Sequence, residues 1–96
     1  MATFISLLNF TDQGIRSVKK SPGRAEEFKA MAEKLGVTVR DIYWTVGRYD
    51  LVVVLEGTDE AVTKALLIAG SLGNVRSESL RAFTEGEFNG IVGNMP

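Results

Sequence analysis

The alternation of apolar and polar positions is most regular in residues 41–56, where two strand-like runs flank the dipeptide Gly47-Arg48. Glycine can adopt the positive φ that a tight hairpin turn needs, so the sequence predicts a β-hairpin centred on this dipeptide. The predicted register places Ile42 opposite Val53. Widening the turn to a four-residue loop about the same centre leaves that register unchanged.

The two faces of the predicted hairpin differ in character. One face is almost wholly apolar and is expected to point toward helices. The other face is apolar in its middle and acidic at its ends. The first face consists of Ile42, Trp44, Val46, Tyr49, Leu51, Val53 and Leu55, and the second of Asp41, Tyr43, Thr45, Asp50, Val52, Val54 and Glu56.

The remaining elements follow from strand composition and helix boundaries. Strands are rich in β-branched and aromatic residues, whereas helices begin at capping residues and repeat apolar positions at spacings of three and four. Together the elements predict β-α-β-β-α-β order and a short tail. The segments are the strand Thr3–Phe10, the helical stretch Thr11–Gly36 that restarts with Ser21 as N-cap before Pro22, the strands Val37–Val46 and Tyr49–Glu56, the helix from Thr58 to Gly73-Asn74, the strand Val75–Phe83, and a tail opening with the capping box Thr84-x-x-Glu87.

This order is that of a ferredoxin-like α+β domain, with a four-stranded antiparallel sheet and both helices on one face. We expect the strands, numbered along the chain, in the order 4-1-3-2. Residues 1–96 form a single domain on this interpretation, and residues 84–96 form a C-terminal helical tail.

The central strands are apolar on both faces, although two helices can cover only one. A second apolar face of this size is typical of an interface. We therefore expect two sheets to pack into a dimeric α+β barrel, with Val52 and Val54 in the interface. The alternative is that the tail beginning at Thr84 folds over this face.

The composition excludes several classes of partner and of catalytic side chain. The net charge of −1 argues against nucleic acid as the main partner. The chain contains no Cys and no His, which excludes thiol and imidazole chemistry, and the acidic residues fall in first helical turns rather than in a metal-binding pattern. We expect no metal and no cofactor. No membrane-length apolar run and no secretory signal is present, so a cytoplasmic protein is expected.

Candidate site residues cluster around the hairpin: Tyr43, Trp44, Arg48, Tyr49 and Asp50. Each has a structural interpretation beside the functional one. Trp44 is expected in the core, whereas Tyr43 faces either a partner sheet or a ligand. Asp50 is expected to be structural, accepting hydrogen bonds from Thr45, from turn N–H groups or from an Arg such as Arg48 or Arg40. Burial would instead make it a candidate base.

A second group of charged residues lies on the first helical stretch. Arg16, Lys19 and Lys20 recur at helical spacing, and Arg24 follows near a helix start. Such a group can hold a phosphate or a carboxylate. A solvated helix face is the commoner explanation of the same pattern.

Five short motifs together resemble the GYD domain family, which is named for the Gly, Tyr and Asp that stand here at Gly47, Tyr49 and Asp50. The resemblance covers nearly the whole chain. It implies the ferredoxin-like, dimeric α+β barrel class and brings no established reaction. The motifs are Thr11-Asp12-Gln13-Gly14-Ile15, Ser21-Pro22 with Arg24, Gly47-Arg48-Tyr49-Asp50, Gly73-Asn74-Val75-Arg76 and Leu80-Arg81-Ala82-Phe83-Thr84.

These observations leave three functional hypotheses. The first is a non-catalytic dimeric module that binds a small apolar or aromatic molecule or assembles with itself. The second is a cofactor-free enzyme, an isomerase or a monooxygenase-like activity on an aromatic or enolic substrate, that uses Tyr43, Tyr49 and Asp50. The third is a self-assembly unit without any ligand.

Overall fold

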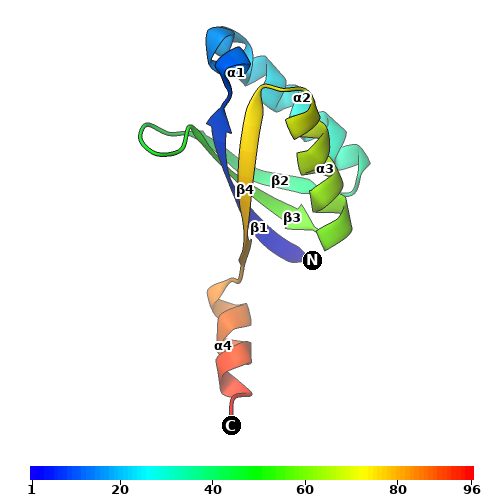
Figure 1. Ribbon diagram of the computed structural model, residues 1–96. Coiled ribbons are helices and arrows are strands. Elements are labelled where there is room, and N and C mark those ends of the chain that lie inside the picture. The colour runs from blue at the N-terminus through cyan, green and yellow to red at the C-terminus, as the bar shows by residue number, and fades with distance from the viewer.

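The computed structural model describes residues 1–96 and has the element order expected from the sequence (Figure 1). Its four strands form one antiparallel sheet in the order β2-β3-β1-β4, which confirms the predicted ferredoxin-like topology. The elements are β1 (Ala2–Phe10), α1 (Asp12–Arg16), the 3-10 turn η1 (Val18–Lys20), α2 (Ser21–Lys34), β2 (Thr38–Trp44), β3 (Leu51–Gly57), α3 (Asp59–Ser71), β4 (Val75–Ala82) and α4 (Glu85–Gly93).

Strand β3 lies inside the sheet, and its strict alternation separates the two faces. Leu51, Val53 and Leu55 are 6%, 5% and 0% exposed because α2 and α3 cover them (Figure 1). Leu8 of β1 pairs with Leu51 and is equally buried, at 7%. The hydrophobic core therefore lies between these two strands and the helix layer.

The two helices that cover the sheet pack closely where α2 ends and α3 begins. Ala32 of α2 is fully buried near Val37, and Val62 and Ala65 of α3 are buried as well. Gly57 allows this approach, because a Cβ atom there would lie 3.3 Å from side-chain atoms of both Val37 and Val62. Small side chains thus bring the end of α2 close to the start of α3.

The start of α2 differs from the prediction. Ser21 is the first residue of the helix, and Lys20 takes the N-cap position without any side-chain cap. The buried Ser21 hydroxyl instead accepts a hydrogen bond from the indole Nε1 of Trp44, at 3.0 Å. The preceding 3-10 turn supplies the entry into α2, so no capping hydroxyl is needed there.

The hairpin between β2 and β3 has the predicted register, with Ile42 opposite Val53. Thr45 N–H donates to the Asp50 carbonyl at 2.8 Å, which closes the wider loop over residues 46–49. The expectation that Val46 and Tyr49 continue the apolar face was therefore wrong. Val46 is fully exposed, because side-chain alternation stops where the ladder stops.

The opposite face of the sheet, here called the free face, carries no helix. Ile5 and Leu7 of β1 and Val52 and Val54 of β3 share it, and all four are only half-buried. The C-terminal tail does not fold over them, because α4 extends beyond the end of β4, away from the sheet (Figure 1). The molecule is accordingly elongated, with a longest extent of 52 Å.

None of the helices combines the length and apolarity that a membrane crossing requires.

Gly47 offers a direct test of the turn, because its φ of +140° lies in a region that L side chains rarely adopt. A Cβ atom at this position would meet no other atom, so Gly47→Val should act through backbone strain alone. We expect a loss of about 1–3 kcal/mol in the free energy of unfolding, measured by urea denaturation.

Gly23→Ala is the matched control. Gly23 lies inside α2 with open space around it, so the added methyl should leave stability equal or raise it by up to ~1 kcal/mol. A Gly47→Val protein as stable as the wild type would show that the loop can adopt another conformation at no cost.

Candidate functional site

Asp50 ties the hairpin to the end of the neighbouring strand. Its carboxylate Oδ2 accepts a hydrogen bond from Phe10 N–H at 2.8 Å, and its own N–H donates to the Leu8 carbonyl at 2.8 Å. The expectation that Thr45, a turn N–H group or an Arg binds this carboxylate was wrong. The Thr45 hydroxyl donates to the Tyr49 carbonyl, Arg40 binds Glu56 at 3.0 Å, and Arg48 lies over the Tyr49 ring. The carboxylate completes the hydrogen bonding of β1 beyond the last pair of the β1–β3 ladder.

Tyr49 reaches across the free face to β4. Its hydroxyl donates to Glu78 Oε1 at 2.9 Å, and Arg48 lies over its ring at 5.8 Å from the centroid. The hydrogen bond to Glu78 is the main reason that the pKa of Tyr49 is raised above its usual value, since loss of the proton would break the bond and oppose two negative charges.

The two aromatic residues before the loop are more exposed than a core position would be. Trp44 lies on the side of the helices but is 46% exposed, so its prediction as a core residue was wrong. The hairpin end extends past the helix layer, as Figure 1 shows, and only Ser21 of α2 anchors the indole. Tyr43 is 58% exposed on the free face.

Three of the five predicted site residues make hydrogen bonds to three different strands or helices. Tyr49 binds Glu78, Asp50 binds Phe10 and Trp44 binds Ser21, each in a separate direction. No group of three or more His, Cys, Asp or Glu side chains is placed to hold a metal ion.

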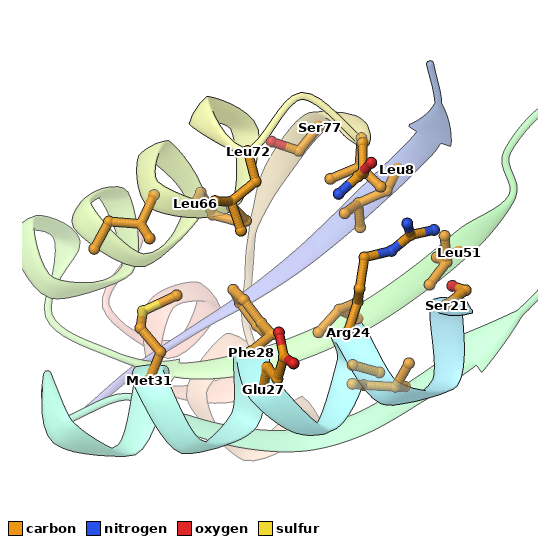
Figure 2. A pocket seen from close by; sticks show the side chains of 17 residues that line it. Leu8, Ser21, Arg24, Glu27, Phe28, Met31, Leu51, Leu66, Leu72 and Ser77 are labelled. Atoms are coloured by element: carbon orange, nitrogen blue, oxygen red, sulfur yellow. The ribbon is translucent and has the colours of Figure 1, made fainter. Parts of the chain in front are cut away.

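A cleft of about 530 Å³ lies between α2 and α3, at the open end of the helix layer. None of the five predicted residues lines it. Figure 2 shows its walls, formed by Phe28 and Met31 of α2, by Leu66 of α3 and by Leu72, which directly follows α3. The sequence contained one signal for it: Ala25 and Ala69, small residues on the lining helices, leave space between them.

Helix α4 is a further exposed feature. The predicted capping box is present, with Thr84 Oγ1 accepting from Glu87 N–H at 3.1 Å and Glu87 Oε1 accepting from Thr84 N–H at 2.8 Å. The Thr84 N–H bond is the main cause that lowers the pKa of Glu87. Phe88, Ile91 and Val92 are 56%, 46% and 47% exposed, so the apolar side of α4 is uncovered.

Comparison with known proteins agrees with this geometry. A family model described as the GYD domain matches residues 4–92. The chain belongs to the GYD domain family. The match confirms the resemblance carried by Gly47, Tyr49 and Asp50, the three residues that form the hairpin loop and its anchors.

One relative of this GYD protein has a name that states what it binds. The glutamine synthetase and cystathionine beta-lyase binding protein of Thermus thermophilus is 39% identical over 84 residues, which cover 85% of this chain and 88% of the relative. No solved structure gives a significant match.

The anchoring contact of Asp50 can be tested by removing its acceptor. Asp50→Ala leaves the partly buried Phe10 N–H without a partner, so we expect a loss of about 1–3 kcal/mol in unfolding free energy. Asp50→Asn retains one acceptor oxygen and should lose less. Chemical denaturation measures both.

Asp41→Ala is the control, because Asp41 is exposed on β2 and makes no side-chain hydrogen bond; its effect should stay within about 0.5 kcal/mol. Equal stability of the Asp50→Ala and Asp41→Ala proteins would contradict a structural role for Asp50.

Proposed function

We propose that this GYD protein is a non-catalytic binding module that forms a homodimer through its free face and binds other proteins. The observation that carries the proposal is the uncovered apolar surface. Ile5, Leu7, Val52 and Val54 form the centre of one sheet face, and no part of the monomer covers them. A contiguous apolar face that the monomer leaves uncovered is characteristic of an interface.

Binding to other proteins is supported by two further features. The relative from Thermus thermophilus is named as a binding protein for two enzymes, glutamine synthetase and cystathionine beta-lyase. In addition, α4 presents an uncovered apolar side at a distance from the sheet, which suits insertion of a helix into a groove of a partner. Such partners would place the protein in the cytoplasm.

The enzyme hypothesis has less support. It requires Tyr43, Tyr49 and Asp50 to act together on one substrate, but the Asp50 carboxylate is bound to a backbone N–H at the end of β1 and the Tyr49 hydroxyl to Glu78. A general base must reach the substrate proton within hydrogen-bonding distance, and none of these three groups lines the cleft between α2 and α3.

Val54→Lys tests the dimer. In the monomer Val54 is half-buried and faces away from the helices, so a lysine there can extend its ammonium group into water. In a sheet-to-sheet dimer the same ammonium group is desolvated without a partner, and we expect the dimer to dissociate. Sedimentation at micromolar concentration distinguishes the two species.

Leu67→Lys is the matched control, since Leu67 is 68% exposed on α3 and the substitution adds the same charge outside the proposed interface. Its protein should sediment like the wild type. A wild-type protein that sediments as a monomer would end the dimer proposal.

The protein partners can be tested with purified glutamine synthetase and cystathionine beta-lyase from the source organism. We expect the wild type to form a complex with at least one enzyme, and Phe88→Ser to weaken it, because that side chain is 56% exposed on α4. Calorimetric titration measures both affinities. Absence of binding to either enzyme by the wild type would refute these partners, and equal binding by Phe88→Ser would exclude α4 as the contact.

A further inference from the structure

The cleft between α2 and α3 has the dimensions of a binding site for a small molecule. Its volume of about 530 Å³ falls within the range of roughly 300–1,000 Å³ that such pockets occupy. Most of its lining is apolar. Phe28 and Leu66 contact the buried core and yet remain half-exposed, because the far ends of their side chains face this space.

The only cationic side chain of the lining lies toward one end of the cleft. Figure 2 shows Arg24 and Ser21 toward one end, whereas Met31 and Leu66 lie at the opposite end. The side-chain oxygen of Ser21 is held by the Trp44 indole, so the hydroxyl proton of Ser21 remains free to donate. A molecule that fills the cleft therefore needs a polar head and an apolar body.

Arg24 determines the charge of that head. Its Nη1 donates to Ser17 Oγ at 2.9 Å, and its Nη2 donates to the carbonyls of Gly14 and Ser17, both at 3.3 Å. These bonds hold the guanidinium in position but place no negative charge beside it, because no carboxylate lies within 4.0 Å.

The guanidinium is thus a fixed, half-buried cation without a counter-ion. A guanidinium has five N–H donors in a planar fork, and the Nε–H of Arg24 makes no bond. An anionic group at this end of the cleft would receive charge-assisted hydrogen bonds from this partly buried guanidinium.

Glu27 is the other charged residue of the lining, one helical turn after Arg24. Its carboxylate is exposed and forms no ion pair. It repels an anion in the cleft, so it lowers the affinity for a carboxylate while Arg24 raises it. Removing the charge of Arg24 should therefore lower the affinity for an anionic ligand, whereas removing the charge of Glu27 should not.

We propose that this cleft binds a small amphipathic molecule with an anionic head group, whose head lies against Arg24 and whose apolar body lies along Phe28, Met31 and Leu66. The inference goes beyond the proposed binding of proteins. It does not depend on the free face or on α4, because every residue it uses belongs to the helix side of the sheet.

Decanoate and the uncharged 1-decanol are suitable probes. We expect decanoate to bind the wild type saturably and to shift the backbone amide resonances of α2 and α3 in NMR spectra, with decanol binding more weakly. Ala69→Phe should abolish the binding of both probes, because the added ring occupies the cleft. The inference is overturned if decanoate does not saturate, if its shifts map to the free face, or if Ala69→Phe binds it unchanged.

The head-group assignment is tested with two charge variants. Arg24→Gln should weaken decanoate binding by roughly tenfold or more, the difference that a charge-assisted hydrogen bond makes. Its affinity for decanol should stay the same. Glu27→Gln should bind decanoate at least as tightly as the wild type. Any other order of the three affinities rejects Arg24 as the head-group partner.

Two controls separate this result from a change in fold. Arg16→Gln removes a charge from exposed Arg16 of the neighbouring α1 and should leave decanoate affinity unchanged; an equal loss there would attribute the effect to net charge and reject the site. Arg24→Lys keeps the charge and should retain more affinity than Arg24→Gln. If Arg24→Gln unfolds, the Glu27→Gln and Ala69→Phe results decide the inference on their own.

Discussion

The structure depends on one imbalance: the central strands have two apolar faces, and the helices cover only one of them. Leu51, Val53 and Leu55 fix α2 and α3 against their side of β3 by burial. Val52 and Val54 lie between them in sequence, so their side chains must point the other way. Two helices on one side of the sheet can bury only one of these two sets. The other set stays uncovered in the monomer, and it is the basis of the proposed self-association.

The helix layer contains a second imbalance, in the size of its side chains. Where α2 ends and α3 begins, Ala32, Ala65 and Gly57 permit close approach and the core is tightly closed. Toward the other end, Ala25 and Ala69 are again small, but no larger residue fills the space that they leave. The same preference for small residues thus produces close packing at one end and a cleft at the other.

The three residues that give the GYD domain its name together hold the end of the hairpin in place. Gly47 permits the loop, Tyr49 joins the loop to β4 through Glu78, and Asp50 joins it to the end of β1 through Phe10 N–H. A hairpin alone is only marginally stable in water, so its end needs such attachments. These contacts account for Tyr49 and Asp50 without any reaction, and they hold the hairpin end at the border between the free face and the helix layer.

The sequence by itself determined the elements, the strand order and the hairpin register, because these follow from short-range physics. Side-chain alternation, capping residues such as Thr58 and Thr84, and the crossover rule all act within or between neighbouring segments. The two-sided apolar character of β3 was visible for the same reason.

Only the tertiary structure decided where Tyr49 and Trp44 lie, which N–H the Asp50 carboxylate accepts from, and where the cleft opens. Phe10 is 40 positions from Asp50, and Glu78 is 29 positions from Tyr49. Contacts over such separations depend on how far the loop extends and how widely α2 and α3 diverge, and the periodicity of a single segment does not encode either distance.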